Sequence, residues 1–112
     1  MSQAVDEEQQ HKVQEALDWF AAKMSVFSKE EQEAINACAI AFAERDLVVI
    51  PKVSIAVNAK CSQAYLMSYV SFAFFKIGKK RKDAARFLCI VFEAYFPGGE
   101  GFVYKKMLGA KG

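Results

Sequence analysis

Apolar residues recur every three or four positions through most of this chain, which is the spacing of helices and not of strands. The first such row predicts a helix over about 7–24, with acidic residues near its start, where the helix dipole favours negative charge. The row consists of Val13, Leu17, Phe20 and Met24. Ser28 and Glu31 have the spacing of a capping box in front of another apolar row, so a second helix is predicted over about 29–45.

The segment 47–57 gives two conflicting signals. Its many β-branched residues favour a strand, whereas Pro51 suits the first turn of a helix. No second strand-like run is present to pair with it. We therefore expect an extended linker that ends at Ile50 and a short helix over about 51–58, with a strand as the alternative.

Two strongly apolar segments follow and predict a helical hairpin. Ser62 is a candidate N-cap for a helix over about 63–77, and Gly78 suits the left-handed position just after a helix end. Asp83 marks the start of the next helix, which Pro97 and the two glycines after it are expected to end.

Together these patterns predict an all-α fold, a compact single-domain bundle of four to six helices over 1–112 with the hairpin at about 63–96 as its core. The tail after residue 100 adds a short packed helix, and the ends 1–6 and 109–112 are expected to fray. A chain of 112 residues that is 54% hydrophobic is long enough to build a core without metal or disulfide cross-links.

The expected helix over 63–77 is apolar on every side, which is unusual in a domain of this size. Either this helix is the central rod of the bundle, or one of its faces meets another chain. Aromatic residues suit interfaces as well as cores. The candidate residues for an oligomer seam are Tyr65, Tyr69 and Phe72.

Charge is divided sharply along the chain. Residues 1–50 carry ten acidic and four basic residues, a net charge of −6, whereas residues 51–112 carry three acidic and eleven basic residues, a net charge of +8. Such a polarised field steers association with charged partners and does not by itself choose a fold.

The basic residues concentrate in what we call the basic turn, residues 76–86. Its members are Lys76, Lys79, Lys80, Arg81, Lys82 and Arg86. The turn is either a solvated connection or an anion-binding edge, whose ligand is an acidic protein surface, the acidic part of a second copy, or nucleic-acid phosphates. Because the residues after Arg86 are apolar, the following helix cannot read base edges in a major groove. Nucleic-acid binding would also draw on Lys105, Lys106 and Lys111.

Recognisable catalytic and metal-binding motifs are absent from the sequence. The one histidine, His11, lies in the charged start of the first helix without a neighbouring nucleophile. Cys38, Cys61 and Cys89 are far apart in the sequence, so we expect buried free thiols in a reducing cytoplasm and no zinc site. No cofactor and no enzymatic activity are expected.

The sequence therefore favours a non-enzymatic, cytoplasmic protein-interaction module, a small adaptor, inhibitor or regulator that binds a partner surface and forms a homo-oligomer. The alternative is a nucleic-acid-binding protein that contacts phosphates through the basic turn. A membrane span is not expected, because each apolar segment of the hairpin is shorter than the roughly 20 residues that cross a bilayer. A membrane partner is not favoured, and reversible docking of the basic residues on an anionic membrane is the third and weakest alternative.

Overall fold

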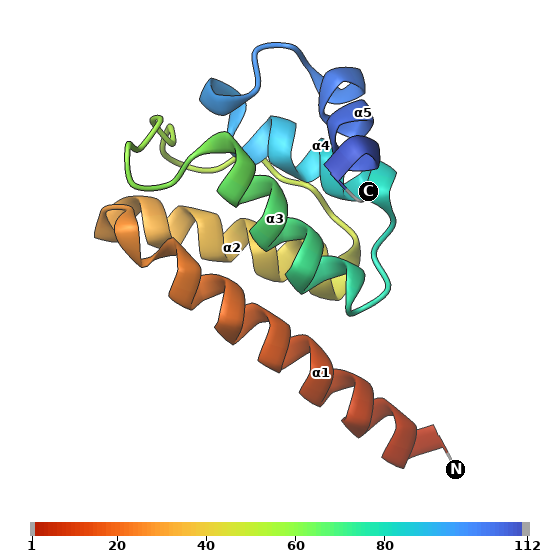
Figure 1. Cartoon of the computed structure of the whole chain (residues 1–112). Helices are drawn as coiled ribbons and strands as arrows, with labels where there is room; N and C mark the ends of the chain where they lie inside the picture. The colour runs from red at the N-terminus through yellow and green to blue at the C-terminus, as the bar shows by residue number, and fades with distance from the viewer. Residues whose placement is uncertain (1, 111–112) are drawn as a thin grey trace.

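The computed structural model describes the backbone of residues 2–110 and the side chains of residues 7–107. Across this part of the chain there are five α-helices, two short 3-10 helices and no β-strand (Figure 1). The elements are α1 (Ser2–Lys23), η1 (Met24–Val26), α2 (Lys29–Arg45), α3 (Gln63–Phe75), α4 (Arg81–Val91), η2 (Glu93–Tyr95) and α5 (Glu100–Ala110). The prediction of an all-α bundle of four to six helices is confirmed.

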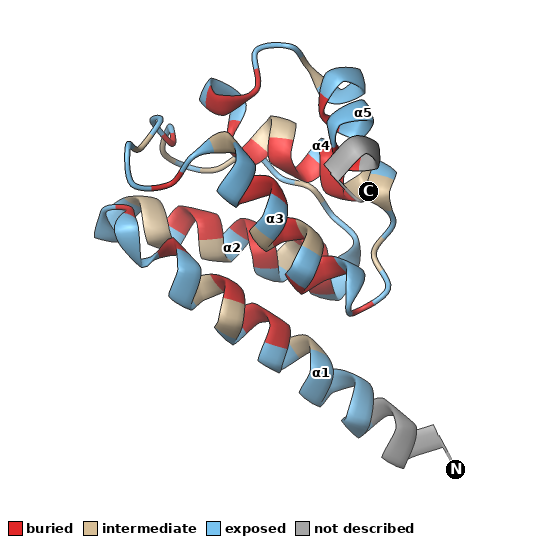
Figure 2. Ribbon diagram, in the orientation of Figure 1, coloured by how far each residue is buried: buried red, intermediate tan, exposed pale blue. Residues whose placement is uncertain are grey.

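The helices pack in a chain of neighbours. Helix α1 lies against α2 and α3, α3 lies against α4, and α4 lies against α5 (Figure 1). The N-terminal part of α1 extends past the rest of the bundle, and residues 7–12 are exposed there (Figure 2). Among the helices that the structure describes, none is both long and apolar enough to cross a lipid bilayer.

The core is built around four phenylalanines, one from each of the first four α-helices. They are Phe20, Phe42, Phe74 and Phe87, and all four are buried. The ring centroid of Phe42 lies 4.9 Å from that of Phe74 and 5.0 Å from that of Phe87, which is the range of favourable aromatic packing. The predicted hairpin thus forms the core together with α1 and α2.

Three helix-boundary signals in the sequence act as predicted. The Ser28 hydroxyl accepts a hydrogen bond from the Glu31 amide at 3.2 Å, and the Glu31 carboxylate accepts one from the Ser28 amide at 3.0 Å. The Ser62 hydroxyl caps α3 by accepting from the Tyr65 amide. Gly78 follows α3 with a φ of 91°, the left-handed conformation expected of a glycine there.

The short helix predicted over 51–58 is wrong, and the strand alternative does not form either. Residues 46–62 connect α2 to α3 as an irregular linker that passes behind α3 in the view of Figure 1. The linker's single ladder contact is an isolated bridge between Asn58 and Cys61.

Contacts with distant residues explain why the linker stays extended. The Glu31 carboxylate accepts a hydrogen bond from the Ala56 amide, and the Cys38 thiol donates one to the Val49 carbonyl. Ile55 is buried in the core. Because these partners lie on α2 and in the core, the local sequence does not reveal them.

Several helix boundaries also differ from the prediction: α1 spans Ser2–Lys23 instead of about 7–24, and α3 ends at Phe75 instead of about 77. The helix expected to start at Asp83 begins two residues earlier at Arg81, and it ends at Val91 instead of continuing to Pro97. The short 3-10 helix η2 follows α4, and its last residue, Tyr95, forms hydrogen bonds with the linker.

The predicted fraying of the ends stays a prediction. Helix α1 begins at Ser2 and α5 ends at Ala110, so both helices run into the segments concerned. Met1 and residues 111–112, which belong to the same prediction, lie outside the described residues.

Candidate functional site

Three aromatic residues of α3 form a row on the surface. Tyr65 is 55% exposed, Phe72 is 51% exposed, and Tyr69 between them is half-buried. Trp19 of α1 joins the row, with its ring centroid 4.5 Å from that of Phe72 and 5.8 Å from that of Tyr69. We call these four residues the aromatic face.

The row bears on one of the two alternatives for the apolar helix, the enclosed rod, whereas contact of the exposed face with another chain stays a prediction. Helix α3 is not an enclosed central rod, because only one side of it is buried. The buried side chains are Leu66, Met67, Val70, Ala73 and Phe74. The other side, which carries the residues predicted as an oligomer seam, is open to a partner.

A groove lies beside the aromatic face, between α3, the start of α4 and α5. Its volume is about 570 Å³. Helix α3 supplies three small side chains and three large apolar ones to its lining, α5 supplies a methionine, and the half-buried Arg81 is the charged member. The lining consists of Ala64, Met67, Ser68, Ser71, Phe72, Phe75, Arg81 and Met107, and we call it the α3–α5 groove.

Three cations border this surface. The Lys76 ammonium lies 4.5 Å from the Phe72 ring centroid, and the Lys23 ammonium lies 5.3 Å from that of Trp19. The Arg81 guanidinium lies 5.9 Å from the Tyr104 ring centroid. Within the described part of the chain, none of the three cations has a carboxylate oxygen within 4.0 Å. The border of the surface is therefore positively charged and unneutralised.

The basic turn does not act as one unit. The Lys79 side chain is only 11% exposed, and its ammonium forms an ion pair with Asp46 at the end of α2 and lies over the Phe42 ring. Lys79 therefore has a structural role within the fold. Lys76 and Arg81 border the groove, whereas Lys80, Lys82 and Arg86 are exposed.

The exposed part of the turn has further basic neighbours on α5. Lys105 and Lys106 are exposed, and α5 packs against α4, which carries Lys82 and Arg86. The remaining residue of the predicted nucleic-acid set, Lys111, lies outside the described residues.

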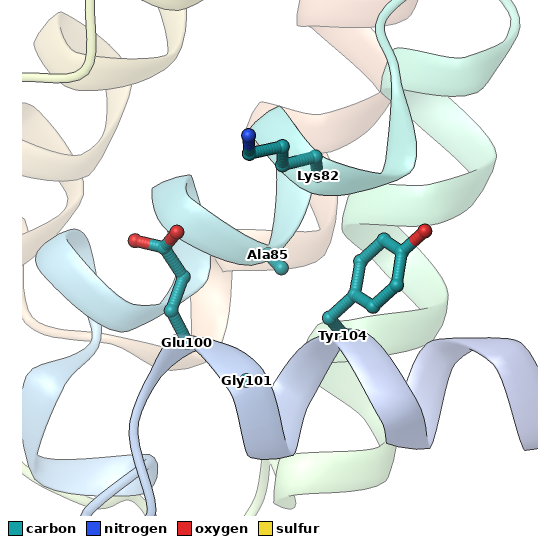
Figure 3. A pocket seen from close by; sticks show the side chains of 5 residues that line it. All are labelled: Lys82, Ala85, Glu100, Gly101 and Tyr104. Carbon is teal, nitrogen blue, oxygen red and sulfur yellow. The ribbon is translucent and has the colours of Figure 1, made fainter.

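A smaller hollow of about 230 Å³ lies between α4 and α5. Glu100 and Tyr104 extend from α5 toward α4, with Gly101 between them and Ala85 opposite (Figure 3). Lys82 completes the lining from α4. The hollow holds one cation, one carboxylate and one phenol, with no nucleophile–base pair among its five lining residues.

The linker exposes a second set of apolar side chains, which the sequence analysis did not single out. Ile50 is 81% exposed, and Leu47, Val49 and Val57 are also exposed. These side chains belong to an irregular segment that contains no aromatic residue.

The groups with potential chemistry are dispersed. Burial raises the pKa of the Cys38 and Cys61 thiols, and burial together with the Glu100 charge raises that of Cys89, so all three favour the unreactive thiol form. His11 is exposed, and its Nε2 atom lies 3.6 Å from the Oε2 atom of Glu15. Among the described residues, no three histidine, cysteine or acidic side chains are placed to share a metal ion.

The sequence pattern identified part of this surface and missed the rest. Trp19 was missed because it flanks the buried row of its helix, and Met107 because nothing in the sequence shows that α5 lies beside α3. The one signal in the sequence that could have indicated an exposed Trp19 was its position outside the apolar row of its helix.

The fold and surface define a small all-α domain with an exposed aromatic face and a groove beside it. No protein-family model, curated protein or solved structure matches this chain.

Proposed function

We propose that this protein is a protein-interaction module that binds a partner through the aromatic face and the α3–α5 groove. The observation that carries the proposal is the exposure of Tyr65 and Phe72, each more than half exposed, beside an apolar groove. Exposed aromatic clusters of this kind are typical of binding sites, because aromatic side chains bury a large area at low cost in conformational entropy.

The proposal needs no chemistry at the surface. An adaptor, inhibitor or regulator acts by occupying a partner's surface, and the groove supplies shape while Lys76 and Arg81 supply charge. The three free thiols fit a reducing compartment, which supports a cytoplasmic location. Homo-oligomerisation through the same face is the competing use of this surface.

Site-specific photo-crosslinking tests the proposal. A photo-reactive phenylalanine analogue replaces Phe72 in cells that produce the protein, and the same analogue replaces the exposed Glu33 of α2 as the matched control. We expect a discrete protein adduct from position 72 and none from position 33. The partner in that adduct is then purified, and its affinity for the unmodified protein is measured.

Surface variants complete the test. Tyr65→Ser combined with Phe72→Ser is expected to weaken the purified pair by at least about tenfold, because truncated aromatic hot spots typically cost more than 1 kcal/mol each. Glu33→Ser, the control, leaves the affinity unchanged. Equal affinity for the double variant and the control contradicts the proposal.

Nucleic-acid binding is the second candidate, favoured by the exposed basic side chains on the neighbouring helices α4 and α5. Its test is the binding of random-sequence DNA and RNA at low salt and at about 0.5 M salt, where phosphate contacts are strongly screened. Loss of binding in the combined variant Lys82→Ser and Arg86→Ser supports this candidate, whereas equal binding excludes the basic turn.

A further inference from the structure

We infer that the occupant of the α3–α5 groove is an amphipathic helix of another protein whose polar face is acidic. This inference rests on the proposed function and adds the chemistry of the partner. The groove's shape, its charge and the packing of the aromatic rings each support it.

The shape of the groove suits a helix. Its α3 side runs from Ala64 through Ser68 and Ser71 to Phe75, which is about 16 Å at the helical rise of about 1.5 Å per residue. This is the length of three helical turns. Small side chains along the middle allow close approach of a partner backbone, and Phe72 and Met107 form apolar sides for aliphatic anchors.

The positive charge that borders the groove and the aromatic face favours an acidic partner. Helix α3 itself contains no charged residue, so the field over the groove comes from its borders. Lys76 and Arg81 stand at one end of the groove and Lys23 stands beside the aromatic face, each without a carboxylate within 4.0 Å among the described residues. A half-buried guanidinium such as that of Arg81 gains most from a charge-assisted hydrogen bond.

A second copy of this chain fits the surface less well. A symmetric pairing through α3 brings the three bordering cations of each copy toward those of the other, which is unfavourable. The acidic end of α1 is also a poor guest. Residues 7–12 read Glu-Glu-Gln-Gln-His-Lys and offer no apolar side chain to fill the groove.

Nucleic-acid bases fit it less well too, because base stacking needs free ring faces. The Tyr65 and Tyr69 rings are stacked on each other at 12° between planes, and the Lys76 ammonium covers Phe72. The Lys23 ammonium lies near the ring centroids of both Trp19 and Tyr69. These contacts reduce the ring area that is free for base stacking.

The single tryptophan makes the inference directly measurable. Trp19 is the only tryptophan of the chain and belongs to the aromatic face, so its fluorescence reports on ligands bound there. The probes are two tryptophan-free synthetic helical peptides of about 14 residues, long enough to cover three turns. Both carry leucine at helical spacing on one face, and the other face carries glutamate in one peptide and lysine in the other.

We expect the glutamate peptide to shift the Trp19 fluorescence and to bind at least about tenfold more tightly than the lysine peptide at low salt. About 0.5 M salt is expected to reduce this preference. Arg81→Glu is expected to abolish or reverse it, whereas Lys52→Glu, an exposed charge reversal on the linker, leaves it unchanged. Ser68→Gln, which fills the groove without changing charge, weakens both peptides.

The outcomes separate this inference from the proposed function. Equal binding of both peptides, or binding of neither, overturns the acidic helix as occupant, and the crosslinking experiment at Phe72 still decides whether the face binds a protein. A Phe72 adduct that consists of two copies of this chain also overturns the inference. Displacement of the glutamate peptide by single-stranded nucleic acid, with tighter binding of the latter, overturns it in favour of nucleic acid.

Discussion

At the scale of single residues, the hydroxyl of Tyr95 joins the linker to the end of α4. It accepts a hydrogen bond from the Asn58 amide at 2.7 Å and donates one to the Cys61 carbonyl at 2.8 Å. The Asn58 side-chain amide in turn donates to the Val26 carbonyl, and the Gln63 side chain donates to the Tyr95 carbonyl. One buried side chain therefore satisfies backbone groups that a linker without regular structure leaves open.

Replacing Tyr95 with phenylalanine removes this hydroxyl and keeps the ring. We expect the free energy of unfolding to fall by about 1–3 kcal/mol, because a part-buried amide and a buried carbonyl lose their partner. Urea denaturation measures the change. Tyr65→Phe is the matched control, since Tyr65 is exposed, and its effect is expected within about 0.5 kcal/mol. Equal effects of the two variants contradict the role assigned to Tyr95.

The buried thiols predict a loss of stability at alkaline pH. Burial raises the pKa of Cys38 and Cys61 above the ordinary value of 9.0, and burial is also the main cause that raises the pKa of Tyr95 above 10.0. The unfolded chain therefore releases these protons at lower pH than the folded chain. Because the unfolded state then binds fewer protons, the free energy of unfolding falls as pH rises past 9.

Urea denaturation between about pH 7.5 and pH 10 tests this prediction. The free energy of unfolding is expected to be constant at the lower end and to decrease toward the upper end. Cys38→Ala lowers the overall stability and makes the decrease with pH shallower. A pH-independent free energy over the whole range rules out the predicted shift of the thiols.

At the scale of secondary-structure elements, two glycines differ in backbone conformation, Gly78 after α3 and Gly101 in α5. Gly78 lies in the turn after α3 with a φ of 91°, a conformation that costs other residues about 1–2 kcal/mol. Gly101 lies in the first turn of α5 with an ordinary helical backbone, and a Cβ there would meet no atom within 4 Å.

The two glycine-to-alanine substitutions are therefore expected to act in opposite directions. Gly78→Ala lowers the melting temperature, because alanine is strained at positive φ. Gly101→Ala raises it, with a gain of up to about 1 kcal/mol, since alanine is the better helix former and the site has room. Thermal unfolding followed by circular dichroism measures both. A stabilised Gly78→Ala variant contradicts the assigned turn geometry.

At the scale of the whole molecule, the charge division along the sequence becomes a division in space. The acidic helices α1 and α2 lie next to each other in the lower part of the view, and the basic helices α4 and α5 lie next to each other above them (Figure 1). Lys79 crosses this boundary by pairing with Asp46, and so joins the turn before α4 to the end of α2. The basic turn thus contains one residue that serves the fold, whereas its other members have no carboxylate oxygen within 4.0 Å among the described residues.

This division predicts different effects for two adjacent lysines. Lys79→Ala removes an ion pair and a cation–ring contact from a largely buried stem, and we expect the free energy of unfolding to fall by about 1–2 kcal/mol. Lys80→Ala, at an exposed position, changes it by less than about 0.5 kcal/mol. Urea denaturation compares the two variants, and equal effects contradict the structural role of Lys79.

The sequence by itself determined the helical class, the capping box at Ser28, the N-cap at Ser62 and the glycine stop at Gly78. Each of these depends on residues within about four positions of one another, so the local pattern contains the whole interaction. The aromatic row of α3 was visible for the same reason, because Tyr65, Tyr69 and Phe72 lie on one helical face.

Only the tertiary structure decided the linker, the end of α4 and the division of the basic turn. Glu31 and Tyr95 hold the linker through hydrogen bonds to residues far away in the chain, and Asp46 engages Lys79 in the same way. The groove likewise exists because the fold brings Met107 of α5 into one lining with residues of α3. Such contacts depend on which segments meet in space, and helical periodicity carries no record of that choice.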